Sequence, residues 1–460
     1  MPLADKQLAT LWADLGLKPE SLDRINLNGC DPVFPSSFAV GTAAQVSMAA
    51  AALIAADIGA HRGLADQSVS VDMLDAAIEC TGHFTINNKE TPKFAELSGL
   101  YPCRDGWIRI HANFDHHRDA ALQVCGLASG ASTARSKLEA ETLKRDKQPL
   151  ENAILDNGGA CAVVRTFEEW DKLPQAQALT QLPLVEITKL GEAEPQTIET
   201  LRDAQQPLSN IRVLDLTRIL AGPVCGRTLA AYGADVMLIN SPELPNIDSI
   251  IETSRGKLSA HIDLHKETDR DKLLKLISGT HAFIQGYRPG SLAALGLTPE
   301  SLASLKPGIV YTSLSAYGHN GPWSSRRGFD SLLQSASGFN MAEASAKCTD
   351  LPAALPMQIL DYASGFLMAF GTQAALYRQL TEGGSWHVQV SLARTGLWLR
   401  SMGQSSDWLD CETPSTDKFL TSYASEYGHL KALPHPPCFS HTKVKWQRPS
   451  VPPGTHQPNW

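Results

Sequence analysis

The sequence predicts an α/β fold, in which a Rossmann-like parallel sheet with helices on both faces is joined to a smaller α+β domain. The main observation is the stretch from Asn210, which reads NIRVLDLTRILAGPVCGRTLAAYGADVMLIN. An apolar strand at Val213 runs into a turn of small residues at 221–223. A helical segment follows at 225–232, and a second apolar strand covers 235–239. This order is typical of a β-α-β unit.

The same alternation continues further along the chain. Apolar strands at Ala282 and Val310 are separated by helical segments, so residues 210 to about 320 should form one parallel sheet. The turn after the first strand lacks the G-x-G-x-x-G fingerprint of dinucleotide-binding proteins. The sequence therefore favours a nucleotide-binding layer of another kind.

Composition excludes several classes of function. The chain has 460 residues, of which 43% are hydrophobic and 19% charged, and its net charge is −8. An acidic chain of this kind does not favour a general binder of nucleic acid or of an anionic membrane. Its 9 cysteines form no C-x-x-C pair, which argues against a zinc site or a disulfide framework. The first 16 residues do not resemble a signal peptide, and the apolar run 48–60 is too short to span a bilayer. We therefore expect a cytoplasmic location.

Three regions are predicted along the chain. Residues 1–200 form the first region, residues 201–402 form the α/β region, and residues 403–460 form a proline-rich tail that should wrap a surface without adding helices. A weak internal repeat connects the first two regions, at 47–77 and 365–396. Each stretch has an apolar helix, a polar loop, an alternating strand and another helix.

Several ordered blocks resemble family III CoA-transferases, the family of formyl-CoA transferases that also includes the α-methylacyl-CoA racemases. The opening stretch VLDLTRILAGP is followed by four further matching blocks. They are RGKLSAHIDL (255–264), GYRPGSLAALGL (286–297), YGHNGPWSSRRGFD (317–330) and LDYASG (360–365). The resemblance implies the fold of that family and the transfer of CoA between an acyl-CoA thioester and a carboxylic acid.

The resemblance also implies a rearranged partial duplication. The stretches SGLYPCRDGWIRIHAN (98–113) and GGACAVVRTFEEWDKLPQAQAL (158–179) are similar to the small domain of the family. The first region thus supplies a small domain without its nucleotide layer, and the second supplies a nucleotide layer without its small domain. The sequence leaves open whether the two partial copies pair within one chain or between chains, so a homodimer is an open alternative.

Asp361 matches the nucleophilic aspartate of the family, just before a helix with an early glycine at Gly365. CoA transfer between two acids passes through an anhydride and an aspartyl-CoA thioester, which requires a carboxylate. The alternative role of Asp361 is a helix N-cap. The repeat pairs Arg378 with Arg62. Arg378 lies 17 residues after Asp361, and the same count back from Arg62 gives Gln45. An amide is not a carboxylate nucleophile, so the first copy should carry a degenerate site.

Phe329 separates the two chemistries of the family. The racemases have a histidine at this position, and two-base proton exchange needs a titratable group on each face of the substrate. The G-F-D triplet at 328–330 therefore disfavours a 2-methylacyl-CoA racemase or epimerase. A non-catalytic CoA-binding relic is the remaining alternative, suggested by the unusual order of the two partial copies.

The resemblance places CoA, as a substrate and not as a tightly bound cofactor, against a basic rim. Arginine suits phosphate because its donors form a fork. The cations in the matching blocks are Arg255, Lys257, Arg288, Arg326 and Arg327. The proposed CoA-binding residues are Leu220, Ala221, Arg255, Lys257, Ile262, Asp263, Leu264, Gly286, Tyr287, Arg288, Arg327 and Phe329.

No metal site is expected from the sequence. His111, His116 and His117 lie close together, but no cysteine or acidic residue has the spacing of a metal ligand set beside them. We expect these histidines to be exposed on a loop and a helix. The expected partners are therefore small molecules, an acyl-CoA and a carboxylic acid.

Overall fold

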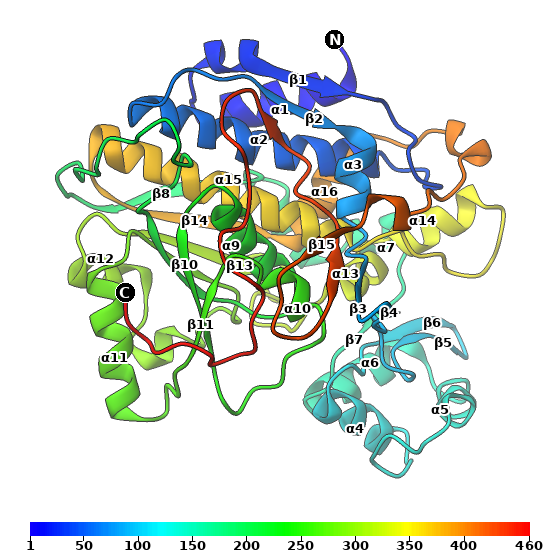
Figure 1. The fold of residues 1–460 in the computed structure, drawn as a ribbon. Coiled ribbons are helices and arrows are strands. Elements are labelled where there is room, and N and C mark those ends of the chain that lie inside the picture. The colour runs from blue at the N-terminus through cyan, green and yellow to red at the C-terminus, as the bar shows by residue number, and fades with distance from the viewer.

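A seven-stranded sheet lies at the centre of the molecule in the computed structural model, which describes all 460 residues (Figure 1). Its strand order is β11-β10-β9-β12-β13-β14-β8. The first six strands run parallel, whereas β8 is antiparallel to β14. The strands are β8 (Glu186–Gly191), β9 (Arg212–Leu216), β10 (Asp235–Asn240), β11 (Leu258–His261), β12 (Ala282–Gln285), β13 (Val310–Ser315) and β14 (Ser385–Ser391). The predicted parallel sheet is confirmed.

Helices cover both faces of this sheet, as the sequence predicted. Alternate residues of one strand point to opposite faces, so Val213 packs toward one helical layer and Leu214 toward the other. The first layer contains α9 (Ala221–Ala231) and α15 (Ile359–Glu382), and the second contains α11 (Glu267–Ser278) and α12 (Pro299–Leu305). Both side chains are fully buried, which explains why the strand reads as a continuous apolar run.

Helix α9 begins one turn earlier than the pattern indicated. Pro223 suggested a turn before the helix, but the helix starts at Ala221 and includes the proline in its first turn. The N–H groups of a first turn have no intrahelical acceptor, so a proline there removes no helical hydrogen bond.

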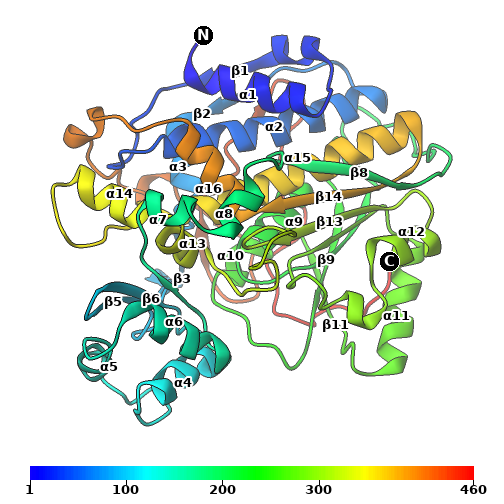
Figure 2. The same cartoon turned by 180° about the vertical axis from the view of Figure 1, so that it is seen from behind.

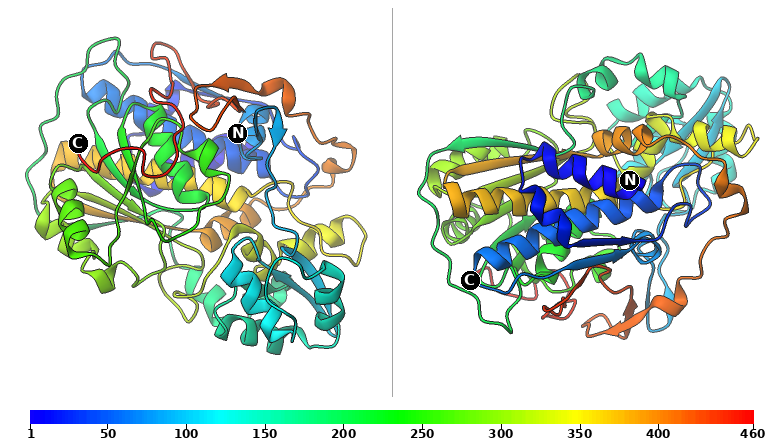
Figure 3. Two further views of the ribbon diagram at one scale, coloured as in Figure 1. Left: turned by 60° about the horizontal axis from the view of Figure 1, so that its bottom comes forward. Right: turned by 90° about the horizontal axis from the view of Figure 1, so that it is seen from above.

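The two regions that the sequence predicts as partial copies pack against each other through one helix of each. Helix α2 (Val40–His61) lies along α15, with Gln373 Nε2 donating to the carbonyl of Ala51 at 3.0 Å. Figure 3 shows the blue α1 (Leu3–Asp14) and α2 beside the gold α15. Helix α2 is long and apolar enough to cross a membrane, but 89% of its most apolar window is buried in the core. The repeat units are α2, β2 (Val69–Asp72) and α3 (Met73–Glu79) in the first copy, and α15, β14 and α16 (Leu392–Ser401) in the second.

A small domain projects from one end of the sheet (Figure 2). It has a three-stranded antiparallel sheet, three helices and a separate apolar core of 13 buried residues. Two further short helices, α7 (Phe167–Asp171) and α8 (Pro174–Leu179), lead the chain back to β8. The elements of the domain are β5 (Gly99–Cys103), β6 (Gly106–Ile110), α4 (Asp115–Val124), α5 (Arg135–Thr142), α6 (Lys147–Asp156) and β7 (Cys161–Val163).

The C-terminal tail runs over the body of the protein and ends beside α11 (Figure 1). It contributes three short strands. Strand β15 pairs with β16, β16 pairs with β3, and β17 pairs with β2. The backbone N–H of His456 also donates to the carbonyl of Ser259 in β11 at 2.7 Å. The strands not yet given are β1 (Ile25–Asn28), β3 (Phe84–Ile86), β4 (Lys89–Glu90), β15 (Thr421–Tyr423), β16 (Leu430–Ala432) and β17 (Cys438–Phe439). The remaining helices are α10 (Ile250–Thr253), α13 (Asp330–Ala336) and α14 (Phe339–Ala346), with 3-10 turns at Pro19–Arg24, Ala293–Leu295, Asp407–Asp410 and Asp417–Phe419.

Candidate active site

A cleft of about 340 Å³ lies at the carboxyl ends of the parallel strands. Its walls include residues of the segments that follow β9, β10 and β12, within 218–221, 244–245 and 286–291, and the carboxyl end of β13 at 314–316. Strand β9 has β10 on one side and β12 on the other, so the strand order reverses at this point. Open α/β sheets bind ligands at such a switch point, where the loops diverge and leave a crevice.

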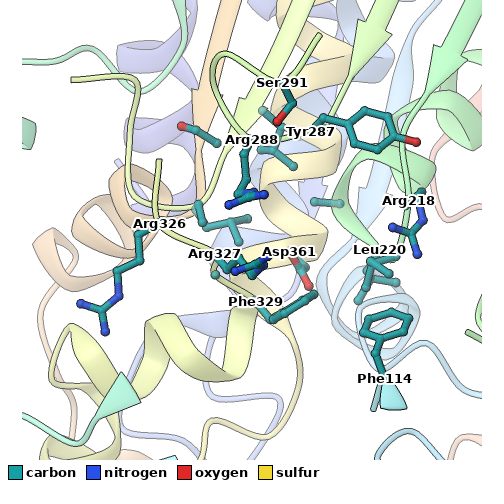
Figure 4. A pocket seen from close by; sticks show the side chains of 18 of the residues that line it. Phe114, Arg218, Leu220, Tyr287, Arg288, Ser291, Arg326, Arg327, Phe329 and Asp361 are labelled. Carbon is teal, nitrogen blue, oxygen red and sulfur yellow. The ribbon is translucent and has the colours of Figure 1, made fainter. Parts of the chain in front are cut away.

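Asp361 lines the inner part of this cleft (Figure 4). It lies in the first turn of α15, three residues after the N-cap Gln358, and not before the helix as predicted. Its side chain does not cap the helix, and its residue is only 8% exposed. Gly365 allows this placement, because a Cβ there would lie 2.5 Å from the carbonyl oxygen of Ala221 at the start of α9. The close packing of α15 on α9 thus brings Asp361 to the cleft.

A second buried carboxyl group, that of Asp330, holds the start of α15. Asp330 Oδ2 accepts a hydrogen bond from the backbone N–H of Asp361 at 3.0 Å, and Gln334 Nε2 donates to Oδ1. Burial raises the pKa of Asp330 to about 6, opposed by these hydrogen bonds and by the charge of Arg109. The pKa of Asp361 is raised well above its ordinary value, first by burial and then by the negative charge of Asp330. Asp361 is thus a carboxyl group that resists ionisation until it meets a compensating charge.

The raised pKa of Asp361 predicts a pH-dependent site. A carboxyl with a raised pKa stays protonated to higher pH, and only the carboxylate attacks, so covalent labelling by an acyl-CoA should accelerate with rising pH. The midpoint should lie above 3.8, the ordinary value for aspartate. In Asp330→Asn the midpoint should move to lower pH, because the neighbouring negative charge is removed. Rapid-quench labelling between pH 4 and 8 measures both midpoints, and identical midpoints in the two proteins would contradict this account.

The cleft is rich in arginine. Arg288 and Arg327 form no ion pair in the structure, and the pKa of Arg327 is lowered by burial and by the charge of Arg288. Arg218 donates to the carbonyl of Pro245 and lies over the ring of Phe114, 5.7 Å from its centroid. Two cations that face a cleft without acidic partners suit a polyanionic ligand.

Arg326 differs from its neighbour Arg327. Its guanidinium pairs with the buried Glu151 at 2.6 Å and stacks on Trp323 at 4.1 Å. Figure 4 shows its side chain directed away from Asp361. Arg326 therefore joins the body of the protein to the small domain and has little charge left for a ligand.

The structure contradicts the predicted roles of Arg255 and Lys257 in CoA binding. Arg255 is 1% exposed, pairs with Glu252, and lies over the ring of Trp446 at 3.9 Å. Lys257 is fully buried, and its Nζ donates at 2.8 Å both to Asp215 Oδ2 and to the carbonyl of Pro223. A buried cation needs such partners, so both residues stabilise the scaffold behind the site and do not reach the cleft.

The three predicted residues after β11 also lie outside the cleft. Ile262 is buried against the apolar core of the second helical layer, and Leu264 packs at its edge. Asp263 accepts a hydrogen bond from the backbone N–H of His265 at 3.0 Å. The cleft does contain the other predicted residues, which are Leu220, Ala221, Gly286, Tyr287, Arg288, Arg327 and Phe329.

An aromatic wall from the small domain closes the cleft, and the sequence did not predict it. His111 stacks on Phe329 with ring centroids 3.8 Å apart and an angle of 6°. Phe114, His116 and His117 line the cleft beside this pair. The small domain of the chain therefore completes the cleft of its own nucleotide layer.

The expectation of exposed histidines is wrong for two of the three. His111 and His117 are each only 4% exposed, whereas His116 is exposed. Burial lowers the pKa of both His111 and His117 to about 3, so both are neutral. No group of three or more metal-ligating side chains occurs in the structure.

Comparison with known proteins gives consistent matches. The family model described as CoA-transferase family III matches residues 28–201 and again residues 208–414. An acyl-CoA transferase of Gibberella moniliformis is 28% identical over 66% of this chain and 56% of its own length. An acetyl-coenzyme A transferase of Hypoxylon pulicicidum is 31% identical over 69% of this chain and 57% of its own.

A solved structure of a hypothetical Mycobacterium tuberculosis protein also matches. It has 31% identity, a TM-score of 0.40, and coverage of 43% of this chain and 58% of its own. The chain thus spans a little more than half the length of the relatives it matches.

Proposed function

The chain belongs to CoA-transferase family III, and on that premise we propose that it transfers CoA from an acyl-CoA to a carboxylic acid through a thioester on Asp361. The observation that supports this most is the position of Asp361 itself. A buried carboxyl without a basic side-chain partner lies at the inner part of a cleft that presents unpaired arginines. The printed names of the relatives, an acyl-CoA transferase and an acetyl-coenzyme A transferase, agree with this class of reaction.

The reaction proceeds in four acyl-transfer steps that together consume no proton. The Asp361 carboxylate attacks the thioester carbonyl, the C–S bond breaks, and a mixed anhydride and CoA thiolate form. The thiolate attacks the aspartyl carbonyl and releases the first acid, which leaves an aspartyl-CoA thioester. The second acid attacks that thioester to give a new anhydride and thiolate. The thiolate then attacks the new acyl carbonyl and frees the Asp361 carboxylate.

The developing oxyanions need hydrogen-bond donors, and α9 is the better source of them. The N–H of Asp361 itself donates to Asp330, so it is not free to bind an oxyanion. Helix α9 begins at Ala221, which lines the cleft together with Leu220. The N–H groups of its first turn lack intrahelical acceptors, so they are free to donate to an oxyanion in the cleft.

The phosphates of CoA belong at the arginine-lined side of the cleft. Arg288 and Arg327 would bind them, and Tyr287 and the backbone at Gly286 would border the nucleotide. This arrangement directs the thiol end of CoA toward Asp361.

Proton exchange at the α-carbon of an acyl-CoA should not occur. Phe329 has no titratable group, and the imidazole stacked on it, that of His111, has a pKa lowered to about 3 by burial. An imidazole whose conjugate acid has so low a pKa is too weak a base to accept the α-proton near neutral pH. Incubation with a 2-methylacyl-CoA in heavy water checks this by mass spectrometry. Deuterium at the α-carbon would restore the epimerase alternative.

Mass spectrometry of the intact protein tests the proposed function directly. After incubation with a panel of acyl-CoAs, the protein should gain the mass of CoA less one water, located on the peptide that contains Asp361. Addition of a carboxylic acid should then remove the mass and yield a new acyl-CoA. A protein that binds CoA without any covalent adduct across the panel would instead favour the non-catalytic relic.

A further inference from the structure

A second, smaller cavity adjoins the cleft at Asp361. It measures about 100 Å³, and its lining shares Ile219, Leu220, Phe329 and Asp361 with the cleft. None of the arginines of the cleft lines it. The Asp361 carboxyl therefore borders two spaces, of which only the larger is lined by arginine.

The inner wall of this second cavity has polar groups without partners. The side chains of Ser331 and Gln358 make no hydrogen bond within the protein, although Ser331 is buried. His111 is 4% exposed, and its Nδ1 has no hydrogen-bond partner. Gln358 is half-buried, so the one fully buried unpaired atom among these groups is His111 Nδ1. Buried polar groups are almost always paired, and this unpaired nitrogen in the cavity wall indicates a polar ligand.

The outer end of the second cavity opens among exposed residues and carries a cation. Pro92, Lys93 and Phe94 line the cavity and are exposed. Lys93 Nζ donates one hydrogen bond, to the carbonyl of Thr81 at 2.6 Å, and has two further protons to donate. This cation stands where an anion from solvent would first meet the cavity.

A second cation stands behind this end. Arg109 on β6 is only 9% exposed, forms no ion pair or hydrogen bond with its side chain, and lies over the ring of Phe94 at 5.1 Å. A buried guanidinium without an ion pair is costly, and the positive charge of Arg109, which already acts on the carboxyl of Asp330, would also attract an anion near Phe94. Lys93 and Arg109 thus supply two cations near Phe94, and the exposed Asp248 also lines the cavity.

The proposed chemistry requires this kind of second space. Once CoA is attached to Asp361, it fills the arginine-lined cleft, yet the first acid must still leave and the second must still enter. We propose that the second cavity is a binding site for the free carboxylic acid and the route by which acids exchange while CoA stays in the cleft. This inference rests on the proposed function, and it assigns the acid a different entrance from CoA.

The cavity also defines the class of acid. Its volume is less than a third of that of the cleft, and its lining mixes aromatic rings with hydroxyl, amide and imidazole groups. A short acid with a polar end fits such a space, whereas a long fatty acyl chain does not. A short dicarboxylate suits this lining best, because one carboxylate can attack the thioester on Asp361 while the other accepts a hydrogen bond from Lys93.

Simultaneous binding of acid and CoA is the test. Calorimetric titration of the wild-type protein with glutarate, alone and with saturating free CoA, should give dissociation constants within about a factor of two of each other. Lys93→Met should weaken glutarate binding by roughly tenfold, the scale of a lost charge-assisted hydrogen bond. It should leave the CoA affinity unchanged. Lys89→Met, which removes an exposed cation from β4 outside the cavity, is the matched control and should change neither.

Each outcome separates this inference from the function on which it rests. Competition between CoA and glutarate, an unchanged glutarate affinity in Lys93→Met, or tighter binding of octanoate than of glutarate overturns the acid-exchange route. If an acyl-CoA also fails to label Asp361 with CoA, the proposed function fails with it. If labelling succeeds while glutarate competes with CoA, the transferase stands and only the separate entrance is wrong.

Discussion

Asp361→Asn should lose CoA transfer and covalent labelling together, while it keeps its fold and its affinity for CoA. The amide has nearly the shape of the carboxyl group, but it cannot attack a thioester carbonyl. The side chain of Asp361 forms no ion pair, and its backbone N–H remains free to bind Asp330. The rate should therefore fall by about 10⁴-fold or more, as when other nucleophiles are removed.

Hydroxylamine and borohydride provide independent readouts of the same residue. An aspartyl thioester is an activated carboxyl derivative, so hydroxylamine should convert it to a hydroxamate and borohydride should reduce it. Either modification, the hydroxamate or the reduced side chain, should appear on the peptide around Leu360 and Asp361 in the wild type and not in Asp361→Asn. Full transfer by Asp361→Asn, with deamidation back to aspartate excluded by mass, would refute the proposed mechanism.

Gln45→Ala is the matched control for this experiment. Gln45 is the counterpart of Asp361 by repeat spacing, and it is completely buried in α2. Its Nε2 donates at 2.8 Å to the carbonyls of Asn28 and Val71, which connects α2 with β1 and β2. Loss of these bonds should reduce stability without affecting the chemistry of folded protein. A loss of turnover in folded Gln45→Ala would mean that the first copy takes part in catalysis.

The parallel sheet could be predicted because its signal is local. Strands such as β9 are buried on both faces, so they read as short apolar runs, and the segments between them read as helices. The position of Asp361 within the first turn of α15 was harder to predict. That helix is held at its start by Asp330, which lies 31 residues earlier in the chain, and no local cap residue marks the boundary.

The errors at the site have a common physical cause. A sequence block gives the presence of a cation but not its partner, and Arg255 and Lys257 are bound to Glu252 and Asp215 in the core. Phe114 was missed, and His117 was expected to be exposed, for the opposite reason. Both come from a domain whose packing against Phe329 depends on the whole tertiary structure. Charge pairing and domain closure are both non-local, and a single sequence carries little information about either.

The way in which the two predicted copies pair could also not be predicted from local sequence patterns. The sequence left open whether they pair within one chain or between two, and the answer depends on α2 packing against α15. Both helices are apolar and rich in small residues, so either would pack equally well on a helix from another chain. The tail favours the closed arrangement, because β16 and β17 connect the α/β region back to strands of the first region.

Arg327→Glu should weaken CoA binding by about 10- to 100-fold, the largest effect expected from any single change in the basic wall. Arg327 has no acidic partner and lies close enough to Arg288 for the two charges to oppose each other. An anion between them relieves that repulsion, whereas a glutamate would pair with Arg288 and repel the phosphate. The loss should shrink at high salt, because screening weakens exposed charge interactions.

Two comparison variants make this last prediction specific to the site. Lys275→Glu makes the same change in net charge at an exposed position on α11, outside the cleft, and should leave the CoA affinity unchanged. Arg326→Gln should lower the thermal stability more than the CoA affinity, because Arg326 is bound to Glu151. Isothermal titration with CoA and thermal melts of the three variants measure both quantities. Both variants have the same net charge, so a general electrostatic effect on CoA is the same in both. Equal CoA affinity in Arg327→Glu and Lys275→Glu would therefore mean that the phosphates bind elsewhere.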